Sequence, residues 1–157
     1  MMKNTPKSYP LQEESSPDVV HEISLSGMTY SRFNRSERMK LIRERLPFDT
    51  LEALVRRSGL SIKLFLQRLD MPQTTYNKKK RENALLDRRD SELVLVLAEV
   101  LDYGLEVFNG EEEKFHRWLK KSNHSLGGVS PESLFDSITG IEEVKFALDR
   151  IEFGAFA

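Results

Sequence analysis

The residues with the clearest capacity for chemistry lie between positions 73 and 89, where cations and neutral polar side chains are interleaved. Lysine and arginine suit contacts with phosphates, whereas glutamine, threonine and asparagine can hydrogen-bond to the edges of bases. This combination predicts a nucleic-acid interface. Its candidate residues are Gln73, Thr74, Asn77, Lys78, Lys79, Lys80, Arg81, Arg88 and Arg89. The alternative is that residues 78–81 form only the solvated face of a helix.

Arg88 and Arg89 are informative because they follow Asp87, a residue type that caps the start of helices. A cation in the first turn opposes the helix macrodipole and costs about 0.3–1 kcal/mol at low salt. Two such placements favour another role, and we expect both arginines to contact phosphate.

No arrangement of residues predicts catalysis. The histidines His21, His116 and His124 lack the spacing of metal ligands, and the chain contains no cysteine. The glutamates at 111–113 and 142–143 are better explained as helix starts than as an acid/base pair. We therefore expect no enzyme activity, no metal and no cofactor.

Composition and charge indicate a globular protein with two different surfaces. The 157 residues are 39% hydrophobic and 31% charged, and the formal net charge is −1. Residues 35–90 carry 15 basic and 8 acidic side chains, whereas residues 91–157 carry 6 and 13. The longest apolar run, 93–98, is far shorter than the roughly 20 residues of a membrane span. We expect a cytoplasmic protein that does not enter membranes.

The basic residues fall in a predicted helix-turn-helix. Apolar residues at 62, 65, 66 and 69 repeat with the helical period, and Ser61 is a suitable N-cap. Asp70 and Pro72 interrupt this pattern, and a second helix over 73–82 would turn Tyr76 inward. Two helices separated by such a short break are typical of this motif. We expect Asp70 to adopt the left-handed conformation that the turn often requires.

The remaining pattern is also helical, so the predicted fold class is mostly α: a helical bundle with a helix-turn-helix half and a small C-terminal helical half. Further helices are predicted over 36–46, 48–58, 87–109, 111–121 and 139–151. Gly59 ends the second of them, and the last starts with a capping box of Thr139 and Glu142. In the predicted helix over 87–109, the run of apolar residues at 93–98 covers most of the helix circumference. That helix should be buried on more than one side. It should join the two halves, present residues 93–101 to a second protomer, or do both.

Three segments follow from these patterns. Residues 1–35 are a predicted flexible tail, within which residues 19–30 could form a short strand or an extended arm. Residues 36–108 form the helix-turn-helix domain with its long connecting helix, and residues 109–157 form the C-terminal domain.

The end of the chain is unusually apolar for a terminus. Ile151, Phe153 and Phe156 fall within the last seven residues, and Phe146 lies off the apolar stripe of the last helix. Burying three such side chains gains about 5–9 kcal/mol, less than the roughly 8–16 kcal/mol needed to order eight backbone residues. Either these residues close their own core, or an ordered helical body carries them to a partner.

Residues 113–157 also contain a set of short motifs. They are Glu113-Lys114, Arg117-Trp118-Leu119, Asn123, Leu126-Gly127-Gly128, Ser130-Pro131, Leu134-Phe135 and the closing stretch from Arg150 to Ala157. Together they resemble the toxin-binding domain of Xre/MbcA/ParS-type antitoxins. Residues 60–107 look like the Xre-like helix-turn-helix of the same family, although Pro72 replaces its usual capping serine or threonine.

The resemblance implies an antitoxin of a type II toxin–antitoxin pair whose toxin is a RES-domain protein that consumes NAD. The C-terminal region would block the toxin's active site, and the helix-turn-helix would bind operator DNA to repress the chain's own operon. The implied toxin-binding residues are Phe146, Arg150, Ile151, Glu152, Phe153, Gly154 and Phe156. A homodimer is expected, because helix-turn-helix proteins usually read two half-sites about 34–36 Å apart. The alternative is a helix-turn-helix transcription regulator without a toxin partner.

Overall fold

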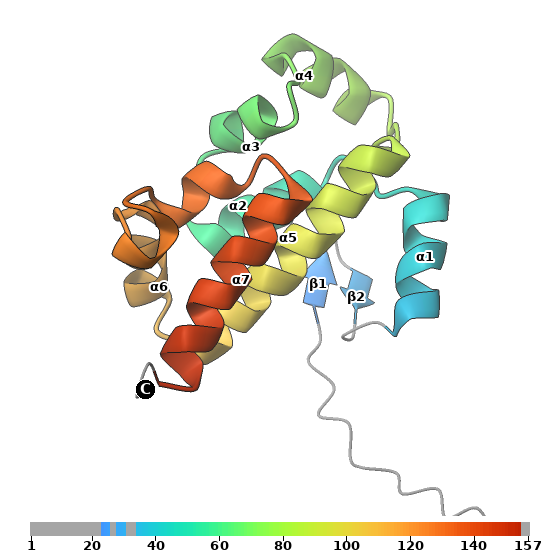
Figure 1. The fold of residues 1–157 in the computed structure, drawn as a ribbon. Coiled ribbons are helices and arrows are strands. Elements are labelled where there is room, and N and C mark those ends of the chain that lie inside the picture. Colours follow the sequence, from blue (N-terminus) through green and yellow to red (C-terminus); the bar gives the residue numbers. More distant parts are fainter. Residues whose placement is uncertain (1–22, 26–27, 31–33, 155–157) are drawn as a thin grey trace, which may run out of the picture.

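The computed structural model describes residues 23–25, 28–30 and 34–154, and helices dominate them (Figure 1). The mostly α fold class is therefore confirmed. In chain order the elements are β1 (Ile23–Leu25), β2 (Met28–Tyr30), α1 (Arg35–Glu44), α2 (Thr50–Ser58), α3 (Ile62–Arg68), α4 (Gln73–Arg81), α5 (Arg88–Val107), α6 (Glu112–Lys120), the short 3-10 helices η1 (His124–Leu126) and η2 (Pro131–Leu134), and α7 (Ile138–Glu152).

A small antiparallel hairpin precedes the helices. Ile23 of β1 lies opposite Tyr30 of β2, and β1 lies against α2 and α5. A strand within residues 19–30 agrees with the sequence pattern. Of the tail predicted over residues 1–35, residues 1–22, 26–27 and 31–33 lie outside the described residues.

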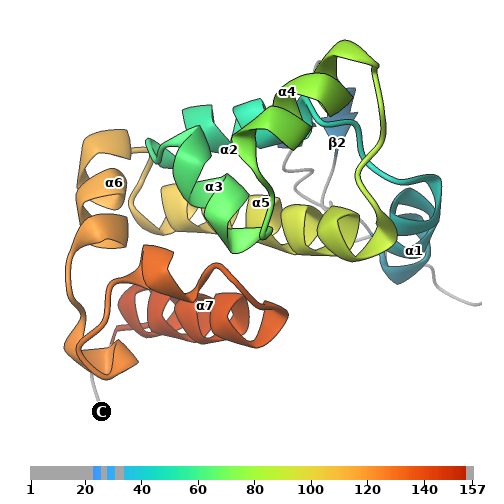
Figure 2. The same cartoon turned by 90° about the horizontal axis from the view of Figure 1, so that it is seen from above.

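Helix α5 is the centre of the molecule. Helices α1 and α2 pack against it, and α7 lies along another side of it (Figures 1 and 2). Leu95, Leu97 and Leu101 are each at most 3% exposed. Burial on more than one side is thus confirmed. The prediction that residues 93–101 form a dimer surface is wrong, because helices of the same chain already cover the apolar side chains of this segment.

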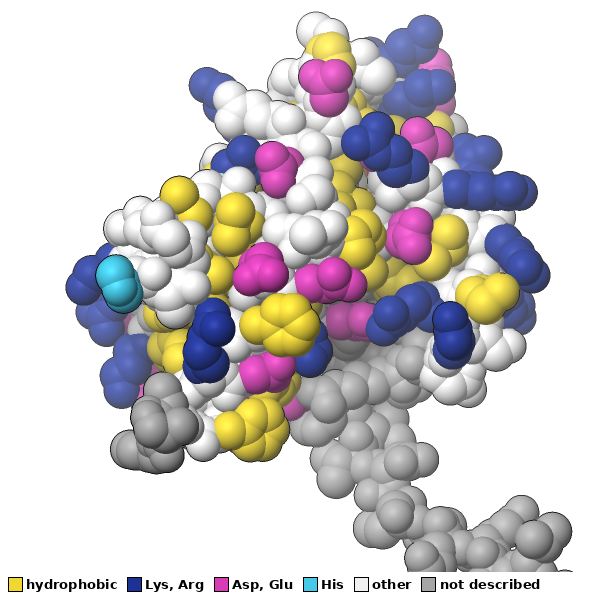
Figure 3. Space-filling model, in the orientation of Figure 1, with side chains coloured by type: hydrophobic (Ala, Val, Ile, Leu, Met, Phe, Trp, Pro, Cys, Tyr) yellow, Lys and Arg dark blue, Asp and Glu magenta, His cyan; other side chains and the backbone are white. Residues whose placement is uncertain are grey.

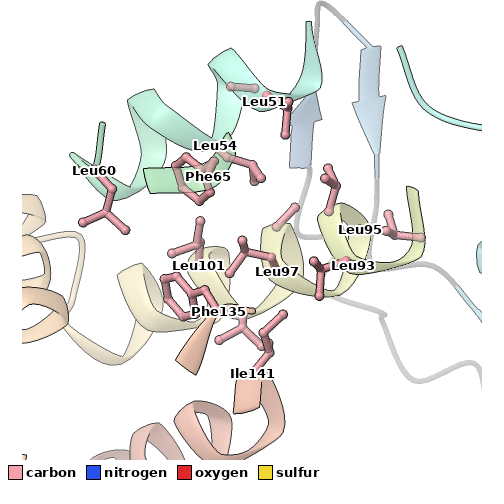
Figure 4. Packing of buried hydrophobic residues seen from close by; sticks show 14 of the residues in the cluster. Leu51, Leu54, Leu60, Phe65, Leu93, Leu95, Leu97, Leu101, Phe135 and Ile141 are labelled. Carbon is pink, nitrogen blue, oxygen red and sulfur yellow. The ribbon is translucent and has the colours of Figure 1, made fainter. Parts of the chain in front are cut away.

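One hydrophobic core extends through both halves of the chain. Leu54 of α2 and Phe65 of α3 belong to it together with Leu101 of α5 and Ile141 of α7 (Figure 4). The first helices and the last therefore share a single packed interior, and the position of each surface helix depends on that interior.

Helix α7 begins earlier than the sequence pattern predicts. Ser137 has an extended backbone, and its side chain accepts a hydrogen bond from the backbone N–H of Gly140 at 3.1 Å. The predicted capping box of Thr139 and Glu142 is therefore wrong. Both residues lie inside the helix because Ser137 already serves as its N-cap.

Candidate functional site

Helices α3 and α4 form the predicted helix-turn-helix. Ser61 caps α3 by accepting a hydrogen bond from the N–H of Leu64 at 3.3 Å. In the turn, Asp70 has a φ of +51°, so its left-handed conformation is confirmed. Met71 is partly buried and packs against the core between the two helices. Pro72 is the N-cap of α4, and its side chain makes no capping hydrogen bond.

The outer face of α4 presents the neutral polar residues. Gln73, Thr74 and Asn77 are exposed, whereas Tyr76 faces inward and is only 4% exposed. The Gln73 side-chain amide donates a hydrogen bond to Oδ1 of Asn77 at 3.1 Å, which orders the two side chains next to each other. The oxygen of Gln73 and the amide nitrogen of Asn77 are left to meet a base edge.

The four cations of α4 are not equivalent. Lys78, Lys79 and Arg81 are exposed and form no ion pair within the part of the chain that the structure describes. Lys80 instead pairs with Glu52 of α2. The hydrogen bond from Lys80 lowers the pKa of the Glu52 carboxyl, and Glu52 raises the pKa of the Lys80 ammonium. The structure thus separates Lys80 from the other predicted phosphate contacts.

Arg88 and Arg89 occupy the first turn of α5, as expected, and both are exposed. Asp87 caps this helix by accepting a hydrogen bond from the N–H of Asp90 at 2.7 Å. The two arginines follow the turn that leaves α4. They therefore extend the basic surface from α4 towards α5.

Helix α1 adds cations that the sequence reasoning missed. Arg45, its C-cap, donates hydrogen bonds from Nε to the carbonyl oxygen of Leu86 at 2.8 Å and from Nη2 to that of Leu85 at 3.1 Å. These hydrogen bonds bring the end of α1, including the exposed Arg43, next to the start of α5. Figure 3 shows Lys and Arg side chains gathered over this side of the molecule and over α4. No local pattern in the sequence indicated this placement, because the contacts of Arg45 cross about 40 residues of the chain.

A second surface lies on α7 and consists of exposed apolar side chains. Phe146 is 54% exposed, Ile151 44% and Phe153 78%. Phe146 and Phe153 lie seven residues apart on the outer side of α7, whereas Ile151 continues the stripe of Val144 and Leu148, which are fully buried. Ile151 and Phe153 therefore do not close the chain's own core, and their contact with a partner stays a prediction. Yellow side chains over α7 are visible among acidic ones in Figure 3.

The other predicted toxin-binding residues lie at the end of α7. Arg150 and Glu152 are exposed, and Arg150 Nη2 donates to the carbonyl oxygen of Ser125 at 3.4 Å. Gly154 follows the helix with a φ of +64°, a conformation that glycine adopts without strain. Phe156 lies outside the described residues.

A groove of about 720 Å³ between α5 and α7 adjoins this apolar surface, and Phe153 lines it together with Tyr103 and Lys145. The Tyr103 hydroxyl donates to Oδ1 of Asp149 at 2.8 Å, and Lys145 pairs with Asp149 at 3.5 Å. Lys145 Nζ also lies 5.6 Å from the centre of the Tyr103 ring. These interactions tie the last turns of α7 to α5, so Phe153 projects from a well-supported helix.

Clusters of metal-ligating side chains and helices that could span a membrane would each indicate a further kind of functional site. Within residues 23–25, 28–30 and 34–154, no three metal-ligating side chains come together. His116 instead shares a hydrogen bond of 2.9 Å with the carbonyl oxygen of Arg57, where α2 ends. None of the helices described is long and apolar enough to cross a membrane.

Two family models match the segments of the chain that carry the two surfaces. Residues 37–99 match the model of the antitoxin Xre-like helix-turn-helix domain, and residues 104–154 match that of the antitoxin Xre/MbcA/ParS C-terminal toxin-binding domain. These two ranges contain the basic surface around α4 and the apolar surface of α7, respectively.

Three curated relatives are similar over much of the chain. A protein named Prs ADP-ribosylating antitoxin from Sphingobium sp. (strain YBL2) is 30% identical over 129 residues, which cover 77% of this chain and 81% of the relative. Antitoxin Xre of Photorhabdus laumondii is 29% identical over 51% of this chain and 54% of its own length. Antitoxin Xre of Yersinia enterocolitica is 26% identical over 59% of this chain and 62% of its own length.

Proposed function

Since the chain belongs to the Xre/MbcA/ParS family of antitoxins, we propose that it neutralises an NAD-consuming RES-domain toxin and represses its own operon. The C-terminal end of α7 occludes the active site of the toxin, and the helix-turn-helix binds operator DNA. A regulator without a toxin partner is the weaker alternative, because the C-terminal half matches a toxin-binding domain.

The observation that carries the toxin-blocking proposal is the apolar end of α7. Phe146, Ile151 and Phe153 are exposed on one ordered helix, so binding a partner requires little further ordering of the backbone. Large apolar side chains that water can reach are typical of protein interfaces, and aromatic ones often dominate the binding energy. Arg150 and Glu152 on the same turn can add charge-assisted hydrogen bonds inside a nucleotide pocket.

The NAD part of the proposal has support from the name of one relative. The name of the Sphingobium protein refers to ADP-ribosylation, and ADP-ribosyl transfer uses NAD as the donor. A toxin with that chemistry has a cleft for NAD, and a helix end that fills the cleft would exclude the dinucleotide. Hydrolysis and phosphorolysis of NAD need the same cleft, so the blocking mechanism does not depend on which reaction the toxin performs.

The arrangement of the two surfaces allows both partners to bind together. Helix α4 and the C-terminal end of α7 lie at opposite ends of the molecule in two perpendicular views (Figures 1 and 2). A toxin seated on the end of α7 would leave α4 free to enter a major groove. We also expect a homodimer that reads two half-sites, with an interface other than the buried face of α5.

The experiment that tests the blocking mechanism uses the purified product of the gene beside this chain, which we propose is the RES-domain toxin. We expect the full chain to stop its consumption of NAD. Phe153→Ala should weaken inhibition by about 2 kcal/mol, or roughly 30-fold, because the aromatic anchor is removed.

Met39→Ala is the matched control, because Met39 is an exposed apolar side chain on α1, away from α7. It should inhibit as well as the original chain. Neither change should lower thermal stability by much, since Phe153 is 78% exposed and Met39, at 45% exposed, lies outside the buried core. Equal inhibition by Phe153→Ala and Met39→Ala would contradict the placement of the toxin interface.

A further inference from the structure

Helix α4 is attached to the rest of the molecule by few apolar side chains. Tyr76 is its one buried residue, and the Tyr76 ring lies 6.1 Å from that of Phe48. Its N-cap, Pro72, offers no side-chain hydrogen bond to the first turn. The orientation of α4 therefore depends strongly on the polar interactions of its inner face.

Glu52 of α2 makes those polar interactions. Its Oε1 atom accepts a hydrogen bond from the Tyr76 hydroxyl at 3.4 Å and pairs with the ammonium group of Lys80. Residues four apart lie on the same face of a helix, one turn from each other. A single carboxylate therefore holds α4 at two successive turns.

The pairing also restricts what Lys80 can reach. The Lys80 side chain is 38% exposed and directed at Glu52, whereas Lys78 and Lys79 are exposed and unpaired within the described ranges. A lysine that binds phosphate strengthens binding to every DNA sequence, because the phosphate backbone carries no sequence information. Discrimination comes instead from side chains that meet base edges at a fixed angle.

We infer that Glu52 determines the specificity of DNA recognition by keeping Lys80 away from the phosphate backbone and by fixing the angle of α4. This inference rests on the proposed DNA-binding function. Glu52 acts through Lys80 and Tyr76, so it is a positioning residue and does not touch DNA itself.

The test measures binding of the full chain to two duplexes of equal length over a range of salt concentrations. One duplex is the DNA directly upstream of the gene for this chain, and the other is the same sequence scrambled. Glu52→Gln preserves the size of the side chain and an oxygen for Tyr76 but removes the charge that holds Lys80. We expect E52Q to bind the scrambled duplex several-fold more tightly and to lose preference for the upstream duplex.

The salt dependence identifies the cause of that change. If the released Lys80 binds a phosphate, the slope of log affinity against log salt should steepen by up to about 0.9. Lys80→Gln alone should leave the slope unchanged, because Lys80 is already held by Glu52. The double variant E52Q/K80Q should show no steepening. Glu113→Gln on α6 makes the same change in net charge at an exposed site and should also leave the slope unchanged.

Each negative outcome has a distinct meaning. An unchanged slope in E52Q, or a flatter slope in K80Q alone, would overturn the role of Glu52. The K80Q measurement gives this answer even where E52Q does not fold. Equal binding of both duplexes by the original chain would instead contradict the proposed operator binding.

Discussion

Lys78 and Lys79 differ from Lys80 in the group that each side chain can reach. All three belong to one run of cations, and sequence spacing alone treats them as equal partners for phosphate. The structure gives Lys80 a carboxylate partner on α2 and leaves its two neighbours in water. Their roles on DNA should therefore separate in experiments that report how many phosphates the protein neutralises.

We predict that replacing Lys78 and Lys79 together with glutamine weakens binding to the upstream duplex and to unrelated DNA by similar factors. The slope of log affinity against log salt should flatten by up to about 0.9 for each phosphate that is no longer neutralised. Fluorescence anisotropy over a salt series measures both quantities.

The matched control replaces Lys120 and Lys121, a pair of exposed lysines at the end of α6, with glutamine. This variant has the same net charge as the first and should retain the original slope. An unchanged slope in the Lys78 and Lys79 variant would show that the basic end of α4 does not bind phosphate.

At the level of single residues, the sequence predicted the types of side chain on each surface but not their partners. Asp70 could be predicted, because a three-residue break between two helices creates a local need for a left-handed residue. Glu52 could not, because it lies 28 residues before Lys80 and helical periodicity describes only one element at a time. The hydrogen bond from Arg45 to Leu86, across 41 residues, could not be predicted for the same reason.

The helices themselves were predictable where an apolar stripe and end signals agreed. The expected helices over 61–69 and 73–82 correspond to α3 (Ile62–Arg68) and α4 (Gln73–Arg81), within one residue at each end. The pattern of α5 was ambiguous in a different way. Apolar residues on all sides of a helix indicate that it is buried, but they do not identify the elements that bury it. In this molecule α1, α2 and α7 pack against α5.

Close approach of α5 and α6 yields a prediction about stability. A Cβ atom on Gly104 would lie 2.3 Å from Cε2 of Phe115, a ring that is fully buried. Gly104→Ala should therefore lower the free energy of unfolding by about 1–3 kcal/mol, although alanine favours helices by about 1 kcal/mol. Urea denaturation measures the change.

A second substitution tests whether crowding is the cause. Phe115→Leu removes part of the ring that Cβ would meet, so the double variant should be less destabilised than the sum of the single changes. A more stable Gly104→Ala variant, as expected for an uncrowded helix, would show that the two helices have room between them.

In the whole molecule, a continuous core links the surface proposed for DNA to the surface proposed for the toxin. Helix α5 begins with Arg88 and Arg89 after the connection that leaves α4, and it runs along α7 (Figure 1). A further link joins the halves, since His116 of α6 bonds to the end of α2. Within the first half, Arg57 of α2 pairs with Asp102 of α5. The opposite charges of the two halves of the sequence indicated separate surfaces but not their shared interior.

The most direct test of the account is the NAD level in cells that express the neighbouring gene, which we propose encodes the RES-domain toxin. It is measured without this chain, with the full chain, and with the chain cut after Asp149, which keeps the hydrogen bond between Asp149 and Tyr103. Soluble yield and the thermal unfolding transition serve as controls for folding of the cut chain. We predict that NAD collapses without the chain, recovers with the full chain and collapses again with the cut one. Equal protection by the cut chain, or a toxin that leaves NAD unchanged, would contradict the account.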